Sequence, residues 1–349
     1  SVSSWIQSKK FDLTFVLLPG ILSVLFVIIS NELNFIPSNV SPLVWLVLVV
    51  FVDVGHVWST LFSTYFHKYS SQEFSKQLFL IPVISWGAGV VLYTLSSKIF
   101  WSMLAYAAVF HFIRQQVGIL KIYLRHTKKD FWNFHFDIFL CYLVTIIPII
   151  YWHITPRSFN WFIEDDFVMI NFARNIKVLW GGLCFFILVY LIKEILNYKE
   201  FNFAKNLHLI STALVWFFGI VYYNNDWTFT FTNIIHHGIP YFALVWASSM
   251  RGAYTAKNNL LQKIMNKGLK IRFIFFISLL LILGFCEEFV WDTFVWHEHN
   301  DLFFNFLSID VDHLTLAWLV PLLSLPQITH YILDGFIWKR HRKINEFKF

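Results

Sequence analysis

The sequence predicts an all-α, polytopic membrane protein with about ten transmembrane helices and with both ends in the cytoplasm. Of the 349 residues, 57% are hydrophobic and only 14% are charged, whereas soluble domains carry about 25% charged residues. Ten apolar stretches are each long enough to cross about 30 Å of hydrocarbon as a helix. Because no soluble segment separates them, residues 1–349 are predicted to form a single transmembrane domain. The predicted spans are 11–30, 42–66, 78–96, 99–120, 136–153, 176–196, 206–223, 230–250, 272–290 and 313–338.

The distribution of basic residues predicts the orientation of these spans. Most of the 27 lysines and arginines lie in alternate connecting segments, as expected when those segments face the cytoplasm. The segments on the opposite side contain only Lys98, Arg157, Arg174 and Lys177. Because the basic residues are spread over short loops rather than gathered on one face, they argue against a nucleic-acid-binding protein. The pattern favours an integral protein of a bacterial inner membrane.

Four of the predicted spans carry histidine near the middle of the bilayer. These residues are His56, His111, the adjacent pair His236 and His237, and His330. Counted along each helix from the nearest cytoplasmic lysine or arginine, they lie roughly 14 to 22 Å deep. Polar side chains at such depths usually face the interior of the helix bundle and mark functional sites. Histidines at a common level on four helices are therefore expected to meet.

Each of these histidines has a polar residue three or four positions away. The partners are Asp53, Gln115, Asn233 and Asp334, and this spacing places both members on one helix face. Neutral imidazole is the commonest biological metal ligand, and a second polar group usually orients it through its other nitrogen. The pattern predicts a shared metal centre, although any single buried histidine is better explained by a hydrogen bond to a neighbouring helix.

The choice between His236 and His237 follows from helix geometry. Adjacent residues point about 100° apart around a helix, so both cannot readily face one metal ion. His237 lies four residues after Asn233 and three before Pro240. We therefore favour His237 as the ligand and expect His236 to face a neighbouring helix or a second metal.

Arg114 is expected to lie inside the fourth span and to need a partner there. Asp334, near the cytoplasmic end of the last span, is the obvious candidate for an ion pair. The alternative is that Arg114 binds a polar headgroup or a carboxylate of a substrate.

An acidic, histidine-containing segment covers residues 287–313 on the predicted outer side. Such a segment is typical of a solvated loop, and it is also a candidate site for a divalent metal. Its ionisable residues are Glu287, Glu288, Asp292, His297, Glu298, His299, Asp301, Asp310, Asp312 and His313.

Histidines on separate membrane helices, here His56, His111, His236 or His237, and His330, resemble the organisation of the Brp/Blh family of membrane β-carotene cleavage dioxygenases. The resemblance implies an all-helical enzyme of similar size in which four histidines hold a non-haem iron. The chain departs from the family pattern, because Asp53-Val-Gly-His56 stands where the family has a Pro-His-Gly element. The paired histidines that flank two arginines in the family are also absent from the sequence.

The function predicted from these features is that of a membrane metalloenzyme. Its metal is expected to be Fe(II), with zinc or copper as alternatives, and its partners are O₂, membrane lipid and a lipid-soluble, carotenoid-like or lipid-like substrate. A second hypothesis is a metal-ion or proton transporter in which the same histidines and carboxylates form a relay. A third is a haem-binding electron carrier, which would use only two of the histidines.

Overall fold

The computed structural model describes residues 5–36, 40–170, 176–251, 254–303 and 308–337. Within these ranges the secondary structure is helical and contains no strand. The β-type pairing in this part of the chain is an isolated bridge joining His67 to Ala256. The predicted all-α class is therefore confirmed.

Eight helical segments in the described residues are long and apolar enough to cross a membrane, which is typical of an integral membrane protein. They coincide with eight of the ten predicted spans, and their ends differ from the predicted ends by a few residues. The segments are Lys9–Glu32, Pro42–Ser63, Ser75–Leu95, Phe131–Ile154, Ile176–Leu196, Phe203–Tyr222, Leu269–Trp296 and His313–Phe336.

The other two predicted spans, 99–120 and 230–250, are also long helices. The first is α7 (Ser97–Tyr123), and the second is α11 (Asp226–Val245), which continues as the π-helical segment η7 (Trp246–Met250). Neither is among the eight apolar segments. These two helices carry many of the polar side chains that predicted a site, and the same side chains lower their hydropathy.

The contacts of the chain divide it into two compact units. The first combines Ser1–Asn39 with Ala108–Pro240 and Phe349, and the second combines Val40–Ala107 with Tyr241–Lys348. Each unit is built from segments that are distant in the sequence, so neither is a simple N-terminal or C-terminal half.

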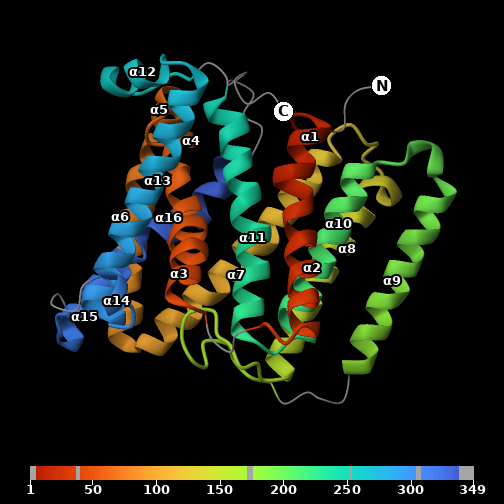
Figure 1. Ribbon diagram of the computed structural model, residues 1–349, viewed down its shortest axis with the longest axis horizontal. Helices are drawn as coiled ribbons and strands as arrows, with labels where there is room; N and C mark the ends of the chain where they lie inside the picture. Colours follow the sequence, from red (N-terminus) through yellow and green to blue (C-terminus); the bar gives the residue numbers. More distant parts are fainter. Residues whose placement is uncertain (1–4, 37–39, 171–175, 252–253, 304–307, 338–349) are drawn as a thin grey trace. The chain divides into compact units, whose positions relative to one another are not determined.

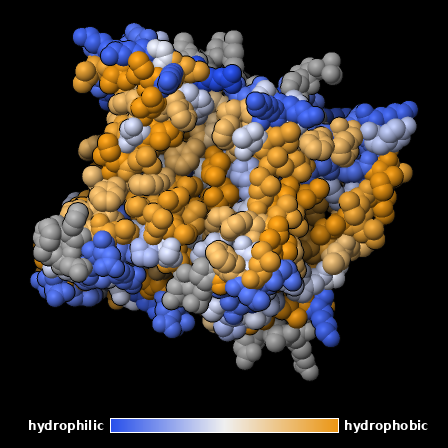
Figure 2. All heavy atoms as spheres, in the orientation of Figure 1, coloured by the Kyte–Doolittle hydropathy of each residue, from blue (hydrophilic) through white to orange (hydrophobic). Residues whose placement is uncertain are grey.

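The first unit is built around α10 (Phe203–Trp216). This helix packs against α2 (Leu18–Glu32) and α8 (Phe136–Ile154), and α8 packs in turn against α9 (Ile176–Leu196), as Figure 1 shows. Only a small part of α9 is buried by the protein, and apolar atoms cover its outward side in Figure 2. Its exposed apolar side chains are those expected of a helix that faces lipid, and they include Val178, Phe185, Leu188, Ile192 and Ile195.

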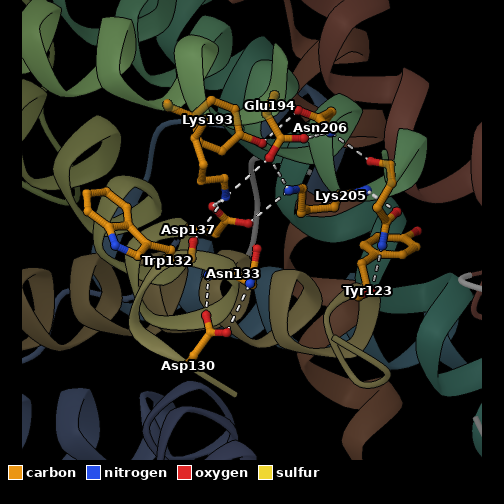
Figure 3. A network of polar contacts seen from close by, with 11 residues as sticks. Tyr123, Asp130, Trp132, Asn133, Asp137, Lys193, Glu194, Lys205 and Asn206 are labelled. Carbon is orange, nitrogen blue, oxygen red and sulfur yellow. Dashed lines mark hydrogen bonds and ion pairs between the residues drawn. The ribbon is translucent and has the colours of Figure 1, made fainter. Parts of the chain in front are cut away.

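A buried ionic network joins α8, α9 and α10 at one end (Figure 3). Asp137 of α8 forms ion pairs with Lys193 of α9 and, at 3.0 Å, with Lys205 of α10. Glu194 lies 2.6 Å from the Lys205 ammonium and accepts a hydrogen bond from Asn206. Two carboxylates and two ammonium groups are thus neutralised together, as buried charges require.

The second unit packs α13 (Leu269–Trp291) against the π-helical segment η2 (Leu46–Val54) and α4 (Gly55–Ser63). Helix α6 (Ser75–Leu95) packs against α15 (His313–Leu323) and α16 (Leu325–Ile337), and α16 also contacts α4. Gly284 lets α13 approach the backbone of η2, because a Cβ atom at this position would lie 2.7 Å from the carbonyl oxygen of Val50. This close approach sets the position of the next turn of α13, which carries Glu287 and Glu288.

Replacing Gly284 by Ala should destabilise the protein by about 1–3 kcal/mol, because the methyl group would meet a backbone atom rather than a flexible side chain. Thermal unfolding of the purified protein in detergent measures this effect. Gly87→Ala, in the middle of α6, is the matched control, since a Cβ there meets no atom within 4 Å. The control should stay within about 1 kcal/mol of the wild type. Equal unfolding temperatures for the two variants would contradict the tight packing at Gly284.

Asp137→Asn should destabilise the first unit by about 3 kcal/mol, because it leaves two buried ammonium groups with one carboxylate. Lys193→Met in the same background should recover part of the loss, since it restores the balance of charge. Unfolding of the two single variants and the double variant gives the coupling between the residues. Strictly additive losses would show that the ion pair contributes nothing.

Candidate metal centre

His56 of α4 and His330 of α16 face each other in the second unit. Their ring centroids are 5.0 Å apart with the planes nearly perpendicular, and both side chains are at least 98% buried. Nδ1 of His56 lies 3.6 Å from Oδ1 of Asp53, one helical turn earlier. The carboxylate predicted beside His56 therefore lies next to the ring, just beyond hydrogen-bonding distance.

A chain of hydroxyl groups holds the His330 ring. Its Nδ1 lies 2.7 Å from Oγ1 of Thr60, which is 3.2 Å from the hydroxyl of Tyr241. That hydroxyl donates to Oδ1 of Asp334 at 2.7 Å. When each hydroxyl donates toward Asp334, Nδ1 of His330 carries the proton and donates to Thr60. Nε2 is then left with a lone pair suited to a metal ion.

His111 of α7 and His237 of α11 form a second pair in the first unit. Their ring centroids are also 5.0 Å apart and nearly perpendicular, and both rings are buried. Phe112 stacks on the His237 ring at a centroid distance of 3.6 Å. The Gln115 side chain donates a hydrogen bond to the backbone carbonyl of His237 at 2.8 Å, so it fixes the helix at His237 rather than the imidazole.

Each compact unit therefore holds one pair of buried imidazoles, His56 with His330 in the second unit and His111 with His237 in the first. Two nitrogens that bind one metal ion at about 2 Å must lie within about 4 Å of each other. The close approach of the two rings within each pair makes all four histidines candidate metal ligands.

His236 lies outside this group, as expected for a residue adjacent to His237. Its ring nitrogens lie 3.4 Å from the Ser211 hydroxyl and 3.3 Å from the Thr212 hydroxyl. A Cβ atom on Gly20 would collide with the His236 ring, so this glycine leaves room for it. His208 is buried beside His236, and its Nε2 is 2.9 Å from the carbonyl oxygen of Gln116.

Two expected contacts are replaced by others. Asn233 was expected to orient an imidazole, but its side chain donates to the carbonyl of Phe229 in its own helix at 3.0 Å. Arg114 was expected to pair with Asp334, but it is exposed and donates to the Tyr142 hydroxyl at 2.8 Å. Both residues lie on the expected helices, α11 and α7, but their side chains make other contacts than those predicted.

The acidic segment 287–313 does not gather its described side chains into one metal site. Asp292 accepts hydrogen bonds from the backbone N–H groups of Glu298 and His299, and Asp312 caps the first turn of α15. The His299 ring stacks on Trp45, and partial burial lowers its pKa. Glu287 and Glu288 are buried within α13, apart from the loop that follows.

Sequence reasoning missed Thr60 and Tyr241. Both lie four residues after a histidine of the group, and the same spacing rule that selected Asp334 would have found them. They were overlooked because a single hydroxyl does not stand out in an apolar helix, whereas a carboxylate does.

An apolar pocket of about 210 Å³ reaches His330 in the second unit. It is formed by α4, α6 and α16, and Thr60 and His330 are among its polar side chains. The apolar part of its wall includes Val57, Trp58, Leu61, Pro82, Leu325 and Leu333.

Comparison with known proteins found no family model that matches this chain, and no curated protein or solved structure with significant similarity to it.

Proposed function

We propose that this protein is an integral-membrane metalloenzyme in which His56, His111, His237 and His330 hold one Fe(II) ion. The observation that supports it is that the four histidines form two close pairs of buried imidazoles, one pair in each unit, with ring centroids 5.0 Å apart in both. Four buried histidines without a common ligand would be costly to keep in an apolar interior. A shared metal ion gives each of them a partner.

The side chains around the imidazoles would fix the ligand geometry. Asp53 lies 3.6 Å from the His56 ring and would orient it once a metal ion is bound, and the chain from Thr60 through Tyr241 to Asp334 would orient His330. Iron is favoured over zinc and copper because four neutral nitrogen ligands leave coordination positions open on a metal that prefers six. Bound Fe(II) would supply the activation of O₂, while the apolar helices exclude water from the reaction.

The pocket at His330 supports a lipid-soluble substrate. Its wall is almost entirely hydrocarbon and aromatic, and the polar atoms that it offers are few. Such a surface suits an alkyl or polyene chain rather than a charged metabolite. The substrate class therefore matches the one implied by the resemblance to the Brp/Blh dioxygenases, and an oxygenase acting on a carotenoid-like or other lipid is the proposed activity.

The proposed topology has ten spans, with α7 and α11 crossing the membrane in addition to the eight apolar helices and with both ends in the cytoplasm. The alternation of basic residues supports it, and a bacterial inner membrane is the proposed location.

A metal-ion or proton transporter is the second candidate. The buried carboxylates of Glu287 and Glu288 favour it, because acidic side chains in a membrane interior often belong to an ion pathway. The two functions differ in the fate of the ion. A transporter in sealed proteoliposomes would release the ion into the lumen, whereas an enzyme would retain it.

Protein purified in detergent should contain about one transition metal ion per chain, because the four ligands form one site. His56→Ala with His330→Ala should remove it, and so should His111→Ala with His237→Ala. Elemental analysis measures the content. Nitric oxide, a surrogate for O₂, should also change the EPR spectrum of the Fe(II)-loaded protein if a coordination position is open.

The matched control for these variants is His126→Ala with His135→Ala, because both residues are exposed. This double variant and His236→Ala should retain the metal. A full metal content in the His56 and His330 double variant would disprove the site.

Leu61→Trp should narrow the pocket without touching a ligand. We expect iron content to stay at the wild-type level and lipid-dependent O₂ consumption to fall about tenfold or more, because small displacements of a bound substrate have large effects on rate. An oxygen electrode measures the rate with a panel of carotenoids and unsaturated lipids. Leu95→Trp, at an exposed position on α6, is the control. Unchanged rates in Leu61→Trp would place the substrate elsewhere.

A further inference from the structure

Three carboxylates gather near the His56 side of the proposed metal centre. Glu287 and Glu288 of α13 are more than 90% buried, and Asp53 of η2 is about one-third exposed. The close contact of Gly284 with the Val50 carbonyl brings α13 against η2 one turn below the two glutamates. The packing of the second unit therefore places these side chains together.

The carboxylates interact with one another rather than with lysine or arginine. The charges of Glu287, Asp53 and Asp292 all act on the Glu288 carboxyl. Among the described residues, no lysine or arginine forms an ion pair with any of the four. Repulsion between like charges in an apolar interior is unfavourable unless protons or a cation neutralise them.

Glu287 has an oxygen atom available for a ligand. Its Oε2 accepts a hydrogen bond from the indole N–H of Trp58 at 2.6 Å. Its Oε1 is buried and makes no hydrogen bond of normal geometry, although the Trp291 side chain lies near the carboxylate. A buried carboxylate oxygen is strongly disfavoured without a partner, so this atom indicates that a cation can be accommodated beside Asp53.

The four acidic side chains form a spatial series that runs from the end of α13 toward His56. Asp292 follows Glu288 by four residues, which places it on the same helix face. Glu288 and Glu287 lie near Asp53, and Asp53 lies 3.6 Å from the His56 ring. Each carboxylate is thus near the next, and the last one adjoins a proposed metal ligand.

We propose that Asp292, Glu288, Glu287 and Asp53 form an acidic entry path along which a divalent cation reaches His56 and its partner imidazoles. The path rests on the proposed metal centre. Carboxylate oxygens bind hard divalent cations weakly and reversibly, while imidazole binds iron and zinc more firmly. The ion therefore moves from oxygen ligands to nitrogen ligands as it proceeds.

The path is tested by the rate at which metal-free protein takes up Zn²⁺, which serves as a redox-stable probe. Full-length protein in detergent is mixed with Zn²⁺, passed over a chelating resin after set times, and analysed for retained metal. Glu288→Gln should reach the wild-type content but load about tenfold more slowly, since electrostatic steering raises association rates by at least that factor. Glu287→Gln should behave in the same way.

Two further variants separate charge from structure. Glu288→Asp keeps the charge and should load near the wild-type rate. Asp310→Asn removes an exposed carboxylate of the same chain segment and should have no effect. Thermal unfolding shows whether each variant is folded.

The possible failures are distinguishable. Wild-type protein that retains no Zn²⁺ would overturn the metal centre itself. Equal loading rates in wild type and Glu288→Gln would overturn the path and show that the carboxyls carry protons instead. A lower final content in Glu288→Gln would also overturn it, because the carboxylate would then be a permanent ligand.

Discussion

The need to give every polar group a partner inside hydrocarbon governs this structure. A lipid-facing surface supplies no hydrogen bonds, so polar side chains on the spans turn toward other helices and fix how those helices pack. Thr60, Tyr241 and Asp334 satisfy one another around His330. Asp137, Lys193 and Lys205 do the same for three helices of the first unit. Helix packing and site geometry therefore have one physical cause.

The positions of the membrane helices could be predicted because length and hydropathy suffice to define a span. Eight spans appear where the sequence placed them. The helices α7 and α11 are not among these eight, since a helix that carries His111, Gln115 and Gln116 or His236 and His237 is no longer strongly apolar. Hydropathy is thus least informative for the helices richest in candidate site residues, and the crossing of the membrane by α7 and α11 stays a prediction.

The site could be predicted in part, because sequence gives depth and spacing along each helix but not rotation around it. His56 with Asp53 and His330 with Asp334 follow from the spacing alone. Arg114 donates to Tyr142 instead of pairing with Asp334, and depth along the helix could not distinguish these two partners. The division of roles at His236 and His237 was predictable, since adjacent residues must point in different directions. Thr60 became apparent only from the packing of α4 against α16.

The π-helical segment η2 determines how α4 is rotated about the helix axis relative to the residues that precede the segment. A π-helical turn contains more residues than an α-helical turn, so nine residues in this conformation rotate everything beyond Val54 relative to an unbroken α-helix. Residues before Leu46 and residues in α4 therefore belong to two different helical registers. A regular periodicity drawn through the whole span would assign His56 to the wrong face. Loss of a single residue within the segment would turn the imidazole by about 100° relative to the residues before Leu46.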